Sequence, residues 1–257
     1  MAYYQIENSL VPGHYDCRRY TDFAFSTHLH REPELTIALS GEITLTVGAR
    51  TETLHAGEAA LILPHEPHSY STSAASDIIV TVFSADYAGD VFAFLRGKHA
   101  LSSVFRPDAC DFGYARAVFE YERSSPYRRR AALYALLSAF IEQAELVTGS
   151  ETDELIARAL AEMSERAGDE SLTMAGLAEA LGYEKHYLSR RFNRALNVNF
   201  RTLLTRCRLD TALSLLREGN LPIEEIAHRS GFSSLRALDR ACRDVTGRTP
   251  TQWKNQR

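Results

Sequence analysis

The spacing of hydrophobic residues changes along the chain and predicts two kinds of structure. Between about residues 20 and 84 apolar and polar side chains alternate, as in residues 43–47 (ITLTV), and turn signals such as Gly41 and Gly48 separate the runs. Alternation with a period of two places successive side chains on opposite faces of a strand. Short strands at this spacing are typical of a β-barrel or β-sandwich, so we expect an N-terminal barrel.

From about residue 87 the spacing becomes helical. Residues 128–147 form the clearest case, with one apolar face made of Leu133, Leu136, Leu137, Phe140, Ile141 and Ala144. Such a helix either covers an open edge of the barrel or pairs with a copy of itself. Residues 148–153 are polar and contain a glycine, so we expect a linker there, followed by helices without strands over 154–257.

Two stretches of the C-terminal region follow one plan, in which a short amphipathic helix, a glycine turn and a second helix succeed one another. The first begins at Ser171, turns at Gly182 and continues in a helix predicted over 184–195. The second begins at Leu221, turns at Gly231 and continues in a helix predicted over 235–245. A long helix predicted over 200–217 separates them, so a helix-turn-helix is expected twice.

The distribution of charge along the chain indicates a class of binding partner. The 257 residues have a net charge of −4, yet residues 171–257 carry 15 Lys and Arg against 8 Asp and Glu. Thirteen of those 15 cations are arginine, whose planar fork matches phosphate and guanine. A basic C-terminal region on an acidic body favours nucleic acid as the partner.

The C-terminal residues resemble the AraC/XylS-type bacterial transcription regulators. The resemblance covers Leu172 to Trp253 and rests on Leu177-Ala178, Gly182, Leu188-Ser189-Arg190, Phe192, Arg208-Leu209, Ala212, Leu215-Leu216, Ile226-Ala227, Gly231-Phe232-Ser233, Arg240, Gly247 and Pro250. The chain departs from the family at Leu238 and Cys242, where aromatic residues are usual, at Asn197 in place of a glycine, and at Trp253 in place of a tyrosine. The resemblance implies two recognition helices in successive major grooves, about 34 Å apart.

The outward residues of the two predicted recognition helices are the candidates for contact with DNA. On the first helix they are Lys185, His186, Ser189, Arg190, Asn193 and Arg194, of which the resemblance assigns His186, Ser189 and Arg190 to base reading. On the second they are Leu235, Arg236, Asp239, Arg240 and Arg243, with Arg236 and Arg240 able to bind guanine through two hydrogen bonds. Lys185, Arg194, Arg201 and Arg243 are expected to clamp phosphates. Any single arginine has the alternative role of capping a helix or pairing with a glutamate.

The N-terminal region carries a second constellation. His28, His30, Glu34 and Gly41 have the spacing HxHx3Ex6G, which resembles the first cupin motif, and residues 57–68 resemble the second with altered spacing. On one strand, residues 28, 30 and 34 would point to the same face. Together with His68 they would suit zinc, nickel, manganese or iron. The alternative is that these residues are a remnant of a cupin ancestor and line a pocket without metal.

The family resemblance implies a small-molecule effector in the barrel. Its expected polar contacts are His28, His30, Glu34, His68 and Tyr70, and its expected apolar neighbours are Ile37, Leu39, Ile43, Leu45 and Leu63. Because a carboxylate and several imidazoles converge, a polar or cationic effector is favoured over an apolar one. The tyrosine-rich residues 1–20 are expected either to close over this pocket or to pack on the barrel rim.

These observations predict an α+β protein with a cupin-like barrel at 1–84, a helical dimerisation or linker region at 85–150 and a double helix-turn-helix domain at 151–257. We expect a sequence-specific transcription regulator, by resemblance an activator, and not an enzyme. Its expected partners are double-stranded DNA, a small-molecule effector, RNA polymerase and a second copy of the chain.

The cytoplasm is the expected location. No apolar run approaches the roughly 20 residues needed to span a bilayer, the first residues do not form a leader, and the four scattered cysteines fit a reducing compartment. Two other functions stay open. One is a metal-dependent cupin enzyme fused to a DNA-binding domain, and the other is an effector-independent regulator whose barrel serves only for dimerisation.

Overall fold

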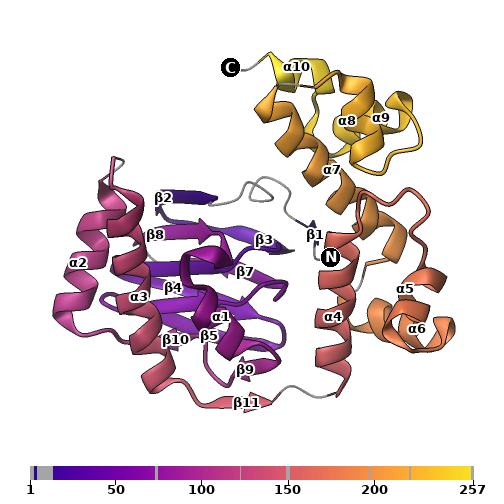
Figure 1. Cartoon of the computed structure of the whole chain (residues 1–257). Helices are drawn as coiled ribbons and strands as arrows, with labels where there is room; N and C mark the ends of the chain where they lie inside the picture. Colours follow the sequence, from indigo (N-terminus) through magenta and orange to yellow (C-terminus); the bar gives the residue numbers. More distant parts are fainter. Residues whose placement is uncertain are drawn as a thin grey trace. The chain divides into compact units, whose positions relative to one another are not determined.

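The computed structural model describes residues 3–4, 14–72, 75–121, 123–148, 151–196, 198–219 and 221–255, without the side chains of 3–4, 151–154 and 217–218. The chain divides into two compact units, residues 12–150 and residues 151–257, the latter grouped with residues 1–11. The first unit contains the β-sheets and the second is helical (Figure 1). None of the helices within the described ranges is long and apolar enough to cross a membrane.

The first unit is built on two antiparallel sheets that share one long strand, β4. The N-terminal half of β4 pairs with β6 and β8, which in turn pair with β10 and β2. Its C-terminal half pairs with β5 and β7, and β7 pairs with β3. The strands of these sheets in the first unit are β2 (Tyr15–Thr21), β3 (Phe25–Leu29), β4 (Glu34–Val47), β5 (Arg50–His55), β6 (Ala59–Ile62), β7 (His68–Ser71), β8 (Ser76–Phe83) and β10 (Val104–Phe105). A further strand, β1 (Tyr3–Tyr4), belongs to the residues grouped with the second unit. The α+β prediction with an N-terminal cupin-like sheet is confirmed.

An irregularity in β4 changes which side chains face the interior. The register with β8 shifts between Ala38 and Ser40. Before this shift the even positions 34, 36 and 38 face inward, and after it the odd positions 43, 45 and 47 do so. Ile43 and Leu45 therefore line the inner core as predicted. The prediction was wrong for Ile37, Leu39 and Leu63, which pack on the outer, helix-covered face.

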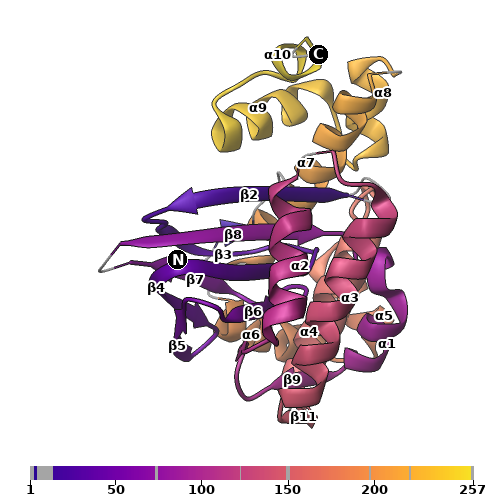
Figure 2. The same cartoon turned by 90° about the vertical axis from the view of Figure 1, so that its left-hand side faces the viewer.

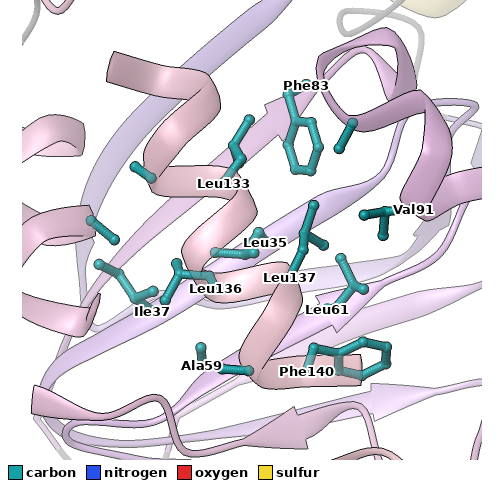
Figure 3. Close-up of a cluster of buried hydrophobic side chains, with 14 of the residues drawn as sticks. Leu35, Ile37, Ala59, Leu61, Phe83, Val91, Leu133, Leu136, Leu137 and Phe140 are labelled. Carbon is teal, nitrogen blue, oxygen red and sulfur yellow. The ribbon is translucent and has the colours of Figure 1, made fainter. Parts of the chain in front are cut away.

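Two antiparallel helices, α2 (Ala109–Glu120) and α3 (Pro126–Gln143), cover the outer face of the sheets (Figure 2). The apolar face of α3, with Leu133, Leu136, Leu137 and Phe140, is buried against Leu35, Ile37, Leu61 and Phe83 (Figure 3). Of the two roles predicted for this helix, covering the barrel is the correct one. Its apolar stripe is consequently not available for pairing with a second copy.

The segment between the barrel and the second unit is less helical than predicted. The helix expected to reach residue 147 ends at Gln143, and Leu146–Thr148 instead form β11, which pairs with β9 (Lys98–Ala100). Helical periodicity could not reveal this pairing, because the partner strand lies far away in the sequence. Shorter helices, η1 (Ala85–Ala88) and α1 (Gly89–Leu95), precede β9. The predicted linker is also too long, since helix α4 begins at Glu151.

The second unit consists of helices whose predicted positions agree closely with the structure. The helices expected over 184–195, 200–217 and 235–245 occur as α6, α7 and α9. The unit comprises α4 (Glu151–Glu165), α5 (Met174–Leu181), α6 (Lys185–Leu196), α7 (Phe200–Glu218), α8 (Ile223–Arg229), α9 (Leu235–Thr246) and α10 (Pro250–Lys254). Leu238 and Cys242, which replace the aromatic residues usual in the family, are fully buried. Asn197 lies outside the described residues.

Replacing Leu136 by alanine tests the packing of α3. The side chain is fully buried between the helix and the sheet, so Leu136→Ala should lower the free energy of unfolding of the first unit by about 2–5 kcal/mol. Urea unfolding followed by circular dichroism measures this change. Tyr127→Ala on the same helix is the matched control, because Tyr127 is 83% exposed and its loss should change the free energy by less than about 0.5 kcal/mol. Equal effects of the two variants would contradict the packing described here.

Candidate functional site

The first helix-turn-helix is formed by α5 and α6, and local interactions fix its ends. The Thr173 hydroxyl accepts a hydrogen bond from the Gly176 N–H (3.1 Å), and Gly182 ends α5 with a left-handed backbone (φ 77°). The carboxylate of Glu184, just before α6, accepts a hydrogen bond from the Tyr187 N–H (2.9 Å). These caps set the direction in which α6 leaves the turn.

Helix α6 buries one face and exposes the other. Leu188, Phe192 and Leu196 are buried in the unit. The opposite face carries the predicted DNA contacts, of which Ser189 is half-buried and the exposed members are Lys185, His186, Arg190, Asn193 and Arg194. Among the residues that the structure describes, none of the cations of α6 is held in an ion pair within 4.0 Å. Arg201, near the start of α7, is also exposed.

Helix α9 has the same division but carries its own counter-charges. Leu238, Ala241 and Cys242 are buried, whereas the predicted DNA contacts Leu235, Arg236, Arg240 and Arg243 are exposed and Asp239 is half-buried. Arg243 Nε donates a hydrogen bond to Asp239 (3.0 Å), and Arg240 Nε lies 3.8 Å from Asp244. Exposed pairs of this kind contribute about 1 kcal/mol or less, so a phosphate or a guanine can displace the aspartates.

In the first unit, the structure brings the predicted His28, His30, Glu34 and His68 together in a buried cluster. One potential ligand atom from each residue lies within 4.8 Å of the others, and all four side chains are buried. The shared parity of residues 28, 30 and 34 suggested that one strand carries them, but the structure places them on separate segments. His28 lies on β3, His30 follows that strand, Glu34 begins β4 after a turn and His68 begins β7.

Each imidazole of the cluster is oriented by a backbone carbonyl. The Nδ1 atoms of His28, His30 and His68 lie 3.0, 2.6 and 2.9 Å from the carbonyl oxygens of Ser26, Glu32 and Glu66. A carbonyl oxygen can only accept, so Nδ1 must carry the proton in all three rings. In the neutral form this leaves the Nε2 lone pair of each ring as the atom able to bind a cation.

The carboxylate of Glu34 is at the centre of the cluster. The Tyr70 hydroxyl donates to Glu34 Oε1 (2.6 Å), and Thr36 Oγ1 lies 2.8 Å from the same hydroxyl. His30 Nε2 lies 3.3 Å from Glu34 Oε2. His68 Nε2 lies 3.7 Å from Oε1 and has no hydrogen-bond partner among the described residues. A lone pair facing a carboxylate is repulsive, so a cation, either a proton or a metal ion, is needed between them.

Burial and the neighbouring charges shift the pKa values of Glu34, His68 and His28 in the cluster. Burial alone would raise the pKa of Glu34, but the charge of His68 and the hydrogen bond with His30 hold it well below its usual value. Burial alone would lower the pKa of His68, but the Glu34 carboxylate raises it. Burial, and then the charge of His68, lowers the pKa of His28 to about 3, which keeps that ring neutral.

Sequence reasoning missed one contributor to this cluster, Thr36. Thr36 is fully buried and holds the Tyr70 hydroxyl, and its parity with Glu34 on one strand could have revealed it. Gly41, included in the motif only by resemblance, has a left-handed backbone (φ 70°), and a side chain there would collide with the carbonyl of Ala75. Gly41 lies where the partners of β4 change from β8 to β5 and β7.

Replacing Tyr70 by phenylalanine tests the anchoring of Glu34. The variant leaves a buried carboxylate without a donor at 2.6 Å, so the free energy of unfolding should fall by about 1–3 kcal/mol. Chemical unfolding followed by circular dichroism measures it, with Tyr127→Phe at an exposed position as the control. An unchanged stability in Tyr70→Phe would show that the hydroxyl does not hold the carboxylate.

Comparisons with known proteins agree with the two-part organisation. The helix-turn-helix domain family matches residues 177–256, and the cupin domain family matches residues 22–83. An uncharacterized HTH-type transcriptional regulator of Staphylococcus aureus is 32% identical over 88 residues, which are 34% of this chain and 12% of that protein. The HTH-type regulator YijO of Escherichia coli K12 is 31% identical over 86 residues, 34% of this chain and 30% of that protein. The similarity thus spans less than a third of either relative.

Solved structures extend the likeness to both units. ToxT from Vibrio cholerae O395, bound to (E)-4-(8-methylnaphthalen-1-yl)but-3-enoic acid, has a TM-score of 0.59 at 13% identity, covering 93% of this chain and 98% of that one. ToxT of strain SCE256, bound to an unsaturated fatty acid, has a TM-score of 0.57 at 13% identity, covering 93% and 94%. At such identities the likeness concerns the fold alone.

Proposed function

We propose that this chain, which matches the helix-turn-helix domain family over residues 177–256 and the cupin domain family over residues 22–83, is an AraC-type regulator that binds double-stranded DNA sequence-specifically and regulates transcription. The observation that supports this most is the exposure of arginine-bearing faces on both α6 and α9 within one compact unit. A major groove about 12 Å wide accepts one such helix, and its base edges offer acceptors to arginine. We propose that the predicted base contacts and phosphate clamps bind DNA through the exposed faces of α6 and α9 and through Arg201.

Alanine substitutions separate base reading from phosphate binding. Arg190→Ala and Arg240→Ala should each cost about 1–3 kcal/mol of specific binding, whereas Arg194→Ala should weaken binding to all duplexes alike and lower the salt dependence by about one ion. Fluorescence anisotropy with a duplex selected from a random library by the full chain measures both effects at several salt concentrations. Arg128→Ala, an exposed arginine of the first unit, is the matched control. Unchanged affinities in Arg190→Ala and Arg240→Ala would contradict the assignment of α6 and α9.

A second proposal concerns the buried cluster, which we infer to be a site for a divalent transition metal. The donor set consists of three Nε2 atoms and one carboxylate, and three carbonyls hold the imidazoles in the tautomer that a metal requires. The convergence of one ligand atom from each of these four buried residues within 4.8 Å is the observation that supports a metal at this site. Tyr70 would then hold the Glu34 carboxylate in place.

Metal analysis of the purified full chain tests this site. After dialysis against zinc, manganese, nickel or iron(II), elemental analysis should find about one ion per chain for at least one of them, and a chelator should lower the melting temperature. His68→Ala should lose the ion, and His55→Ala, an exposed histidine outside the cluster, should keep it. An equal metal content in His68→Ala and the wild type, or no ion in either, would contradict the site.

The cupin unit is also where we propose that a small-molecule effector binds. The structure removes the reason for expecting a cationic effector, because Tyr70 and the imidazoles already surround the Glu34 carboxylate. An effector can change DNA binding only through its different affinities for two arrangements of the protein. ToxT binds carboxylic acids in its solved structures, so acids are the first compounds to screen.

The remaining parts of the regulatory scheme are proposals as well. We propose action as an activator through RNA polymerase, and self-association through the helices of the first unit. A dimer contact there would use the solvent side of α2 and α3, where Tyr114 and Tyr134 are exposed. Cytoplasmic location belongs to the same scheme. We favour regulation over catalysis because the curated relatives that match are described as transcriptional regulators.

A further inference from the structure

The segment that leads into the first helix-turn-helix touches the second motif through backbone, shortly before the recognition helix α9 begins. The connection between α4 and α5 lies against the turn that joins α8 to α9. A Cβ atom on Gly168 would be 2.7 Å from the carbonyl oxygen of Arg229, and one on Gly231 would collide with the carbonyl oxygen of Ala167. Neither position has room for a side chain, so this approach depends on both glycines.

Arg208, in the middle of α7, binds the same connection. Its Nε donates a hydrogen bond to the carbonyl oxygen of Ala167 (3.0 Å), and its Nη2 donates to those of Asp169 (2.8 Å) and Glu170 (3.2 Å). The Nε atom would also be only 2.8 Å from a Cβ on Gly231. The guanidinium therefore lies where α7, the α4–α5 connection and the α8–α9 turn meet.

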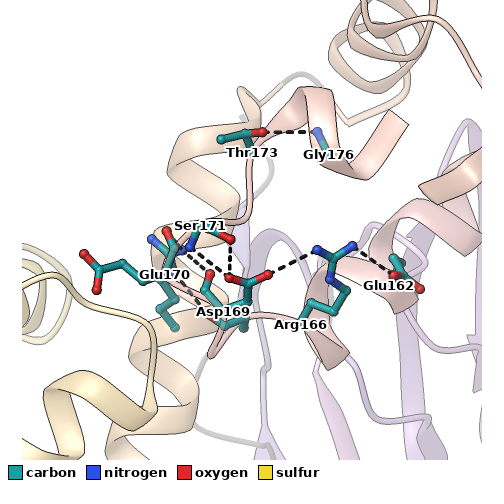
Figure 4. Close-up of polar contacts among 9 residues, drawn as sticks. Glu162, Arg166, Asp169, Glu170, Ser171, Thr173 and Gly176 are labelled. Carbon is teal, nitrogen blue, oxygen red and sulfur yellow. Dashed lines mark hydrogen bonds and ion pairs between the residues drawn. The ribbon is translucent and has the colours of Figure 1, made fainter. Parts of the chain in front are cut away.

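A polar network gives the α4–α5 connection a fixed shape (Figure 4). Arg166 donates to Glu162 (3.3 Å) and to Asp169 (3.1 Å), and Asp169 accepts from the Ser171 N–H (2.9 Å). The carbonyls that Arg208 binds consequently point in set directions. Three hydrogen bonds from one planar group can then hold the connection in one orientation relative to α7.

The contact made by Arg208, Gly168 and Gly231, called the joint below, gives the two motifs a second connection besides α7. Helix α7 contacts α6 on one side and α8 and α9 on the other, and by itself it would link the motifs through a single rod. A rod that bends or twists would change the angle between α6 and α9. The second tie, from the α4–α5 connection to the α8–α9 turn, restrains that angle.

We propose that Arg208, Gly168 and Gly231 are positioning residues that fix the angle between α6 and α9 and thereby set the separation of the two DNA sites that the protein accepts. The proposal rests on the DNA binding proposed above. Insertion of one base pair moves the second site by about 3.4 Å and rotates it by about 35°, because B-DNA repeats every 10–10.5 base pairs. A rigid pair of helices should reject such a duplex, and a loosened pair should tolerate it.

A spacing series measures this property directly. The full chain selects duplexes from a random library, and the strongest two-part sequence is then prepared as selected, with one or two base pairs inserted between its parts, and with the second part scrambled. For the wild type, one inserted base pair should weaken binding by about tenfold or more. For Arg208→Gln and Gly168→Ala, binding to the selected duplex should fall by about tenfold, and the penalty for an insertion should shrink to about threefold or less.

The scrambled duplex and a matched glycine variant serve as controls. Binding to the duplex with only the first part should stay within about twofold of wild type in both variants, because α6 itself is unchanged. Gly247 has a left-handed backbone (φ 70°) similar to that of Gly231 (φ 80°), but a Cβ atom there would have no atom within 4 Å. Gly247→Ala should therefore keep the wild-type spacing profile. Gly231→Ala should behave like Gly168→Ala, and Gly168→Ala decides the matter if Gly231→Ala does not fold.

The outcomes separate this inference from the function on which it rests. If Arg208→Gln and Gly168→Ala fold and keep the wild-type penalty for inserted base pairs, the positioning role is overturned while DNA binding stands. If the wild-type chain selects no two-part sequence at all, the proposed function fails and this inference fails with it.

Discussion

The burial of one face of each short helix against its neighbouring helices is the constraint on which the rest of the second unit depends. Helices of seven to twelve residues, such as α8 and α6, do not hold together in water on their own, and helical propensity alone does not give them a direction. Leu188 and Phe192 of α6, and Leu238 and Cys242 of α9, are fully buried. Packing therefore decides which side chains remain outside, and those are the arginine-rich faces.

The two recognition helices differ in their electrostatics although their packing is alike. Among the described residues, no cation of α6 forms an ion pair within 4.0 Å, whereas α9 carries Asp239 and Asp244 beside Arg243 and Arg240. A phosphate that approaches α9 must first replace these aspartates. If the proposed DNA binding is correct, α6 should therefore supply more of the general attraction to DNA, and α9 should be better suited to contacts that require a well-placed guanine.

The first unit shows how far sequence periodicity reaches. The alternation along residues 43–47 was enough to predict the inner face of the second half of β4. The shift between Ala38 and Ser40 reversed that parity for Ile37 and Leu39, because one irregularity in the register exchanges the two faces of a strand. Helical spacing likewise identified α3 but extended it into β11, whose pairing with β9 is a long-range contact that local patterns do not contain.

The two candidate sites differ in how much of them the sequence could provide. The exposed positions of α6 and α9 follow from the helical repeat once Leu188, Phe192, Leu238 and Cys242 are taken as buried. The histidine–glutamate cluster could be suspected from spacing, but its hydrogen bonds to carbonyls and the roles of Thr36 and Tyr70 require the fold. The joint at Arg208 was beyond sequence reasoning, since it unites three segments that no repeat relates.

Hydroxyl-radical footprinting of the full chain on a selected duplex is the measurement that addresses the central claim most directly. If α6 and α9 enter successive major grooves, cleavage should be reduced in two patches on one face of the duplex, centred about one helical turn (roughly 34 Å) apart. A single patch, or two patches on opposite faces of the duplex, would contradict the account.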